Sequence, residues 1–198
     1  VTMIPTILTL QVPTEEAILD GEVLAWDATH EHFVPFGSNR TVAWEMSDGD
    51  GGTRNLCFIA FDILWLRRSS RDDAATADMT HMPLAVRKQV LADVLVPQQP
   101  FVTMLAYTRH NFCALATSGR SLARREAVLQ AFTQALNNGE EGVMLKQCSS
   151  KYQPGSRGNA WMKVRIPPVC KLLQGRAAVP RVREHRRFLF LCVGALCS

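Results

Sequence analysis

One segment, LCFIAFDILWL, constrains the fold of this chain more than any other. It runs from Leu56 to Leu66, and every residue in it except Asp62 is apolar. An unbroken apolar run of this length is typical of a strand that is covered on both faces. The segment therefore predicts a central strand of a sheet, with other elements packed on either side of it.

Helical and strand patterns alternate along the rest of the chain. Period-two patterns predict further strands at 17–27, 32–39, 101–108, 141–147 and 160–165, with a tight turn or bulge at Gly21. The polar segments 47–55 and 67–78 predict loops. Since several strands adjoin through short turns, the sequence predicts an α+β fold with mainly antiparallel sheets flanked by helices.

Two amphipathic helices are expected. The first begins near Pro83, and its predicted apolar side consists of Leu84, Leu91, Val94 and Leu95. The second follows Ser121 as N-cap and stops at Gly139. Its predicted apolar stripe consists of Leu129, Phe132 and Leu136.

The positive charge of the chain is concentrated at one end. Residues 169–198 carry six Lys and Arg residues and one Glu, a net charge of +5, so that the other 168 residues sum to −1 within a total of +4. The basic composition therefore does not by itself indicate a nucleic-acid-binding face on the body of the protein.

Other bulk properties indicate the compartment. The six cysteines form no C-x-x-C pair, which indicates reduced thiols of an intracellular protein. No secretory signal is recognisable. The longest apolar run, 188–197, is too short to cross a bilayer as a helix, so no association with a membrane is expected.

The segment AWMKVR predicts a cationic strand face. Period two places Trp161, Lys163 and Arg165 on one face and the apolar Met162 and Val164 on the other. The two cations then lie about 7 Å apart, a spacing that suits a phosphate or polyphosphate. The alternative is an ordinary sheet with one solvated face.

The segment EEGVMLK combines an acid, a glycine and a lysine. Strict alternation points Glu141 and Lys146 to opposite faces, so both reach one pocket only if Gly142 allows a bulge or if one of them ends the strand. A carboxylate near phosphate-binding cations could hold a divalent metal that bridges to the phosphate. The alternative is a solvated turn acid and an edge lysine.

Two further residues suggest a nucleotide. Glu22, Leu24 and Trp26 share one side of their strand, which would place an acid among large apolar groups unless Glu22 meets a cation or a metal. Phe61 could stack on a nucleobase. The alternatives are a solvated glutamate at a strand end and an ordinary core phenylalanine.

The order of four segments, DGE, FDIL-L, EG-M-K and W-K-x-[KR], resembles the ATP-dependent DNA ligases, members of the covalent nucleotidyltransferase superfamily. Within that family, FVPFGSN and KYQPGSRGNAWMKVR are most similar to the eukaryotic DNA ligase IV branch. The resemblance implies a severed N-terminal remnant at 1–16, a partial adenylation domain at 17–166 and a basic tail at 167–198 that is unlike the family. By the same resemblance, we expect the OB-fold domain of the family to be missing from these 198 residues.

The resemblance also implies roles for individual residues. ATP and Mg²⁺ would be the cofactors, with Phe61 stacked on adenine and Lys163 on the α-phosphate. Glu22 and Glu141 would bind the metal, and Lys146 would complete the pocket. Arg165 stands where the family usually has a lysine. Such an enzyme is adenylylated by ATP, transfers AMP to a DNA 5′-phosphate and seals the break.

The ligase IV likeness implies double-strand-break repair by end joining. The implied substrate is nicked or broken duplex DNA, the implied compartment is the nucleus, and an end-joining scaffold protein is a possible partner.

One departure from the family concerns the nucleophile. The family's lysine lies in a K-x-D-G motif before DGE, whereas none of the five lysines here is followed by x-D-G and none precedes Glu22. No catalytic residue is therefore assigned, and the chain alone is expected to be inactive.

Two other assignments stay open. One is an RNA ligase or an mRNA-capping guanylyltransferase of the same superfamily. The other is a non-catalytic nucleic-acid-binding fragment whose basic tail makes the contacts.

Overall fold

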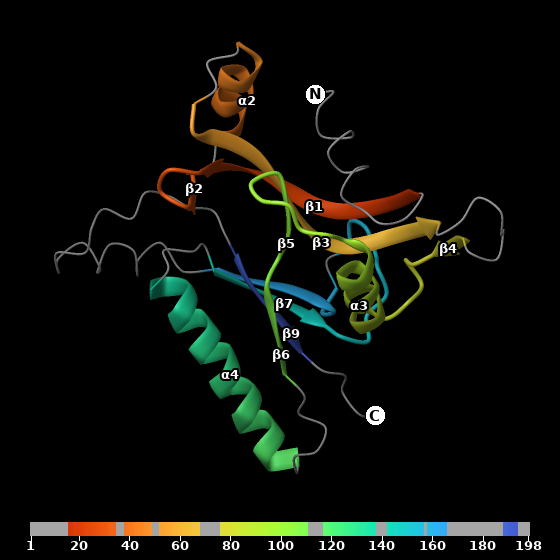
Figure 1. Cartoon of the computed structure of the whole chain (residues 1–198). Helices are drawn as coiled ribbons and strands as arrows, with labels where there is room; N and C mark the ends of the chain where they lie inside the picture. Colours follow the sequence, from red (N-terminus) through yellow and green to blue (C-terminus); the bar gives the residue numbers. More distant parts are fainter. Residues whose placement is uncertain are drawn as a thin grey trace, which may run out of the picture. The chain divides into compact units, whose positions relative to one another are not determined.

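The computed structural model of the chain divides into two compact units, which are described separately (Figure 1). The first consists of residues 1–105 and 151–154, and the second of residues 106–150 and 155–198. The structure describes residues 16–34, 38–48, 52–67, 76–110, 117–137, 142–156, 158–165 and 188–193.

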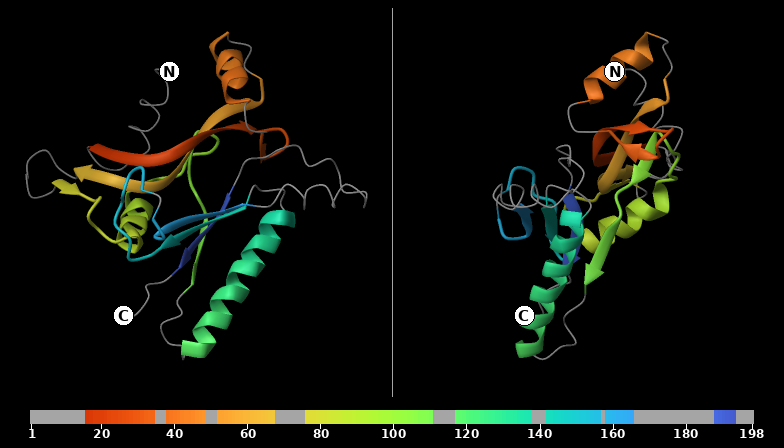
Figure 2. Two further views of the ribbon diagram at one scale, coloured as in Figure 1. Left: turned by 180° about the vertical axis from the view of Figure 1, so that it is seen from behind. Right: turned by 90° about the vertical axis from the view of Figure 1, so that its left-hand side faces the viewer.

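The first unit contains a five-stranded sheet built around two long strands, β1 (Glu16–Asp27) and β3 (Arg54–Arg67). Their antiparallel pairing can be followed in both views of Figure 2. Short strands β2 (His32–Phe33) and β4 (Thr76–Asp78) extend the sheet in the order β2-β1-β3-β4, and β5 (Val102–Met104) runs parallel to β3. The predicted central position of this strand is confirmed, because β3 is paired with other strands along both of its edges. Its coverage on both faces stays a prediction.

The pairing of β1 with β3 is interrupted by bulges rather than by a turn at Gly21. Gly21 lies opposite Ala60 and Asp20 lies opposite Asp62, so Phe61 is the additional residue on β3. A Cβ atom on Gly21 would lie 2.5 Å from the Phe58 ring. Glycine is required here by the close approach of the neighbouring strand.

Helix α3 (Leu84–Val94) covers one face of this sheet. Its predicted apolar side is confirmed, since Leu84, Leu91, Val94 and Leu95 are all buried. Of these, Leu91, Val94 and Leu95 pack in a core cluster with Ala60, Ile63 and Leu66 of β3. Pro83 is the N-cap of the helix rather than its first residue.

The second unit contains a four-stranded sheet in the order β6-β9-β7-β8. Its strands are β6 (Tyr107–His110), β7 (Gly142–Gln147), β8 (Trp161–Arg165) and β9 (Phe188–Val193). Strands β7 and β8 are antiparallel, whereas β9 is parallel to both β6 and β7. Helix α4 (Thr117–Asn137) packs against this sheet.

The predicted stripe of α4 is partly wrong. The helix begins at Thr117, ahead of Ser121, and it buries Ala131 and Ala135 against Val143 and Leu145. Phe132 is partly buried in this cluster, but Leu129 is 54% exposed. The face of α4 that contacts the sheet is therefore the face that carries the alanines. Gly139 lies outside the described residues.

Three segments differ from the expected elements. Strand β2 is only two residues long, and helix α2 (Asn39–Ser47) was not predicted, since the expected strand ended at Asn39 and the expected loop began at Ser47. The expected strand at 101–108 divides into β5 and β6, which join different sheets, and the expected loop at 67–78 contains β4. The predicted α+β class with mainly antiparallel sheets is confirmed. Within the described residues, no helix has the length and apolar character needed to cross a membrane.

Gly142, at the start of β7, provides a test of the second sheet. Its φ of +156° disfavours other residues, and a Cβ atom would lie 2.0 Å from the Val164 carbonyl oxygen. We expect Gly142→Ala to lower the free energy of unfolding by at least about 2 kcal/mol, measured by urea denaturation, because the backbone must move.

Gly155→Ala is the matched control. Gly155 has a φ of +70°, but no atom lies within 4 Å of the position that an added methyl group would occupy. This change is expected to cost only about 1 kcal/mol of backbone strain. Equal losses in the two variants would contradict the close packing at Gly142.

Candidate functional site

The pairing of β7 with β8 separates apolar from cationic side chains. Val143, Leu145 and Val164 join the cluster that packs against α4. Met144 lies opposite Lys163, Lys146 opposite Trp161 and Gly142 opposite Arg165. Because directly opposed residues share a face, the other face carries Lys146, Lys163 and Arg165 together with Trp161. The cationic strand face predicted for 160–165 is confirmed, and Lys146 is added to it.

The three cations of this face differ in exposure. Lys163 and Arg165 are exposed, so they can reach a ligand from solvent. Lys146 is only 3% exposed, and its Nζ lies 3.7 Å from the centroid of the Trp161 ring. The face therefore offers two accessible charges and one that is held against an aromatic surface.

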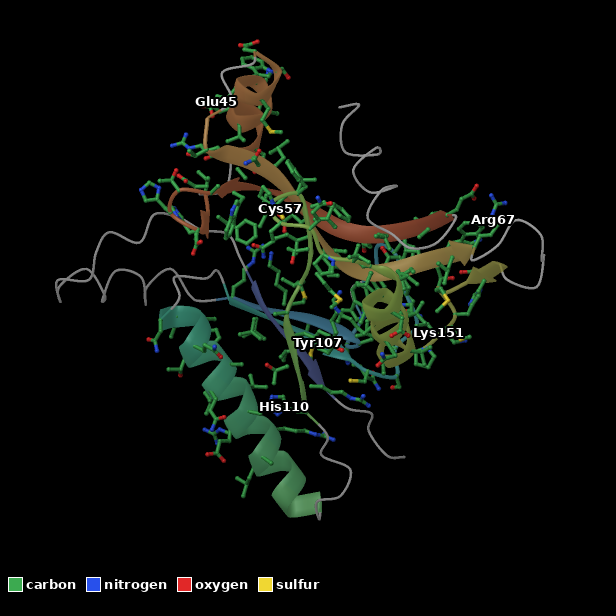
Figure 3. The ribbon with its side chains drawn as sticks, in the orientation of Figure 1. Glu45, Cys57, Arg67, Tyr107, His110 and Lys151 are labelled. Carbon is green, nitrogen blue, oxygen red and sulfur yellow. The ribbon has the colours of Figure 1, made fainter. Side chains whose placement is uncertain are left out.

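Glu22 lies in the first unit, on β1. It is opposite Ile59, and Leu24 is opposite Cys57. Leu24, Cys57 and Ile59 form a core cluster with Trp26, and the position of Cys57 is labelled in Figure 3. The prediction that Glu22 shares a face with apolar groups is confirmed, but Glu22 itself is exposed, as in the alternative of a solvated glutamate. An exposed carboxylate remains accessible to a ligand or a metal.

Phe61 is half-buried at the bulge of β3. It belongs to none of the three hydrophobic core clusters that the described residues form. Bulges commonly re-aim a side chain out of the regular alternation of a strand. Phe61 therefore lies at an irregular point of β3, and its stacking on a base stays a prediction.

Next to Phe61, a buried ion pair anchors β3 to α3. Arg87 Nε donates to Asp62 Oδ1 at 2.8 Å and Arg87 Nη2 donates to Asp62 Oδ2 at 2.9 Å, and both side chains are fully buried. Removing one partner of such a pair typically costs about 3–5 kcal/mol. This pair was not predicted from the sequence, although an aspartate inside an apolar run indicates a buried cation nearby.

Tyr152 extends the same polar group of residues. Its hydroxyl donates to Asp20 Oδ2 at 2.8 Å, and its ring centroid lies 5.8 Å from Cζ of Arg87. The Tyr152 N–H donates to the Thr80 carbonyl at 2.9 Å. Burial, together with the hydrogen bond to Asp20, raises the pKa of Tyr152 to about 12. Asp20 and Asp62 flank the positions of Glu22 and Phe61, so this network fixes the backbone beneath them.

The predicted site residues fall into two sets. Glu22 and Phe61 belong to the first unit, and Lys146, Lys163 and Arg165 belong to the second. Glu141 lies outside the described residues. The chemistry of each set fits a different part of a nucleotide, an aromatic ring for a base and clustered cations for phosphates.

A metal ion would have few ligands from the described part of the chain. Over those residues, no group of three or more His, Cys, Asp and Glu side chains is arranged to hold a metal. Mg²⁺ in phosphate-transfer sites is usually held by one or two carboxylates together with the phosphates and water. An exposed Glu22 fits that mode of binding, in which the nucleotide supplies the other ligands.

Comparison with known proteins gives one family and a consistent set of relatives. The model of the ATP dependent DNA ligase domain matches residues 1–165. A protein named DNA ligase 4 from Arabidopsis thaliana is 29% identical over 155 residues, which cover 76% of this chain and 12% of the relative. DNA ligase 4 of Dictyostelium discoideum is 30% identical over 78% of this chain and 13% of the relative. DNA ligase 4 of Homo sapiens is 25% identical over 79% of this chain and 15% of the relative. The chain therefore spans a small part of the length of these proteins.

The tyrosine network predicts a measurable pH dependence. The pKa of Tyr152 rises from 10.0 to about 12 on folding. Between these two pH values the folded protein keeps the Tyr152 proton, whereas the unfolded chain has released it. The contribution of protonated Tyr152 to the free energy of unfolding is therefore complete below pH 10 and is lost as the pH rises toward 12. In a Tyr107→Phe variant Tyr152 is the one remaining tyrosine, and its tyrosinate absorbance should appear with a midpoint near pH 12.

The control is the same titration in denaturant, where the midpoint should return to the ordinary value of about 10. A midpoint near that value in the folded protein would contradict the buried hydrogen bond to Asp20.

Proposed function

Since this chain belongs to the family of ATP-dependent DNA ligase domains, we propose that it provides the ATP-binding part of a DNA ligase. The observation that carries the proposal is the cationic face of β7 and β8, where Lys146, Lys163 and Arg165 lie opposite the apolar side that packs on α4. Clustered cations stabilise the negative charge that develops during transfer of a phosphoryl group.

Each residue has a distinct proposed role in binding ATP. Phe61 stacks on the adenine, and the exposed Lys163 contacts the α-phosphate with Arg165 beside it. Lys146 adds a second ammonium to the phosphate site.

Glu22 and Glu141 are the proposed metal-binding acids. Bound Mg²⁺ would neutralise charge on the phosphate oxygens. The carboxylate of Glu22 is exposed, so folding does not remove its hydration before a metal ion binds.

The finer biological role follows the same resemblance. The relatives carry the name DNA ligase 4. We propose on this support a role in repair of double-strand breaks by end joining, in the nucleus, with broken or nicked DNA as substrate and an end-joining scaffold protein as partner.

The absence of a K-x-D-G lysine from this sequence leads to a direct prediction. Incubation of the chain with α-labelled ATP and Mg²⁺ should give no labelled protein on a denaturing gel, because no amine stands in the position that forms the phosphoramidate. A full-length DNA ligase treated in parallel is the positive control. A labelled lysine adduct of this chain would contradict the assignment.

Binding of ATP without covalent reaction tests the cationic face. Lys163→Ala should weaken ATP binding roughly tenfold or more, measured by fluorescence anisotropy of a labelled ATP, because a charge-assisted contact to phosphate is lost. Lys151→Ala is the matched control, since Lys151 is an exposed lysine of the first unit, labelled in Figure 3. Equal affinity of the two variants would argue against the proposed phosphate site.

Competition by GTP separates the ligase proposal from the capping-enzyme alternative. Unlabelled ATP should displace labelled ATP from a ligase domain, and GTP should displace it much less readily. Preference for GTP would favour the guanylyltransferase assignment.

A further inference from the structure

Trp161 lies on the cationic face, and the proposed function gives it no role. We propose that Trp161, held in place by Ser150, is a positioning residue that fixes the Lys146 ammonium group for the phosphates of ATP. The inference rests on the proposed function and assigns two residues to it.

The first observation is the burial of Lys146. The side chain is 3% exposed, so its ammonium group has lost most of its hydration, which is costly for a charge. The face of an indole ring attracts a cation, and this attraction is strongest where water is excluded. The 3.7 Å distance from Lys146 Nζ to the ring centroid is the geometry of such a contact.

The second observation is the register that creates this contact. Lys146 and Trp161 lie directly opposite each other on β7 and β8. Directly opposed side chains start from Cβ atoms about 5 Å apart, close enough for a lysine to fold over an aromatic neighbour. The Gln147 N–H donates to the Ala160 carbonyl at 2.8 Å, which continues the pairing beyond this position.

The third observation is that the ring is itself held. Trp161 Nε1 donates to Ser150 Oγ at 3.1 Å, and the Ser150 hydroxyl donates to the Gln147 carbonyl at 2.7 Å. Because the Ser150 hydroxyl donates its proton to the Gln147 carbonyl, the buried Ser150 oxygen accepts the indole N–H with a lone pair. Ser150, in the turn after β7, therefore holds the Nε1 edge of the Trp161 ring, and the face of the same ring contacts Lys146.

These contacts place Lys146 before any ligand binds. A charge that is already oriented loses less conformational freedom on binding than one on a mobile side chain. Lys163 is exposed, whereas Lys146 is buried against the indole. The two lysines would therefore contribute differently, Lys146 as a fixed charge and Lys163 as one that adapts to the ligand.

The geometry can be tested without ATP. The chain has five lysines, so a protein labelled with ¹³C at lysine Cε gives five assignable sets of NMR signals. The Hε protons of Lys146 should be shifted upfield by the ring current of Trp161. The shift should vanish in Trp161→Leu and persist, though smaller, in Trp161→Phe, which keeps an aromatic face. Ser150→Ala should reduce the shift.

Trp44→Leu is the matched control, because Trp44 is a 61% exposed tryptophan of the first unit. This variant should leave the Lys146 signals unchanged. Lys146 signals that are the same in wild type and in Trp161→Leu would overturn the inference. Trp161→Phe serves as the second variant if the leucine variant does not fold.

ATP binding then tests whether Trp161 acts through Lys146. Trp161→Leu and Lys146→Met should each weaken ATP binding about tenfold, and the double variant should be no weaker than Lys146→Met alone. Additive losses would overturn the positioning role while leaving the proposed function intact. Failure of the wild-type chain to bind ATP would contradict the proposed function and with it the role of Trp161, whatever the NMR shifts show.

Discussion

The antiparallel register between β7 and β8 is the constraint on which the proposed chemistry depends. It directs Val143, Leu145 and Val164 toward α4 and places Lys146, Lys163 and Arg165 together on the opposite face. A slip of one residue would exchange the two faces, turning the cations toward the helix and the apolar side chains away from it. Because that exchange would be costly, the register that packs the apolar side chains on α4 also keeps the three cations together on the opposite face.

In the first unit, a strand bulge and a buried ion pair determine the position of Phe61. Strand β3 is bulged at Phe61, while the neighbouring Asp62 is held by two hydrogen bonds from Arg87 and is fully buried. The buried ion pair fixes the strand from the α3 side. Phe61 remains half-buried and outside the core clusters of the described residues. A stacking contact with a base requires a ring on rigid support, which is the role proposed for Phe61.

Patterns that depend on neighbouring residues were predictable from sequence, and those that depend on distant partners were not. Alternation along 160–165 correctly placed Lys163 and Arg165 on one face because strand geometry fixes it. The stripe of α4 was wrong at Leu129 because close packing selected Ala131 and Ala135 instead. The contact of Lys146 with Trp161 could not be predicted, since it exists only once two strands pair in one register. Strand β9, from the segment expected to be a tail, likewise depends on pairing with distant β6 and β7.

The central claim is that the clustered cations of β7 and β8 bind the phosphates of ATP. A crystal structure of the chain with ATP and Mg²⁺ tests this claim most directly. The account predicts phosphate oxygens within hydrogen-bonding distance of Lys146 and Lys163 in the complex. ATP bound away from β7 and β8 would contradict it.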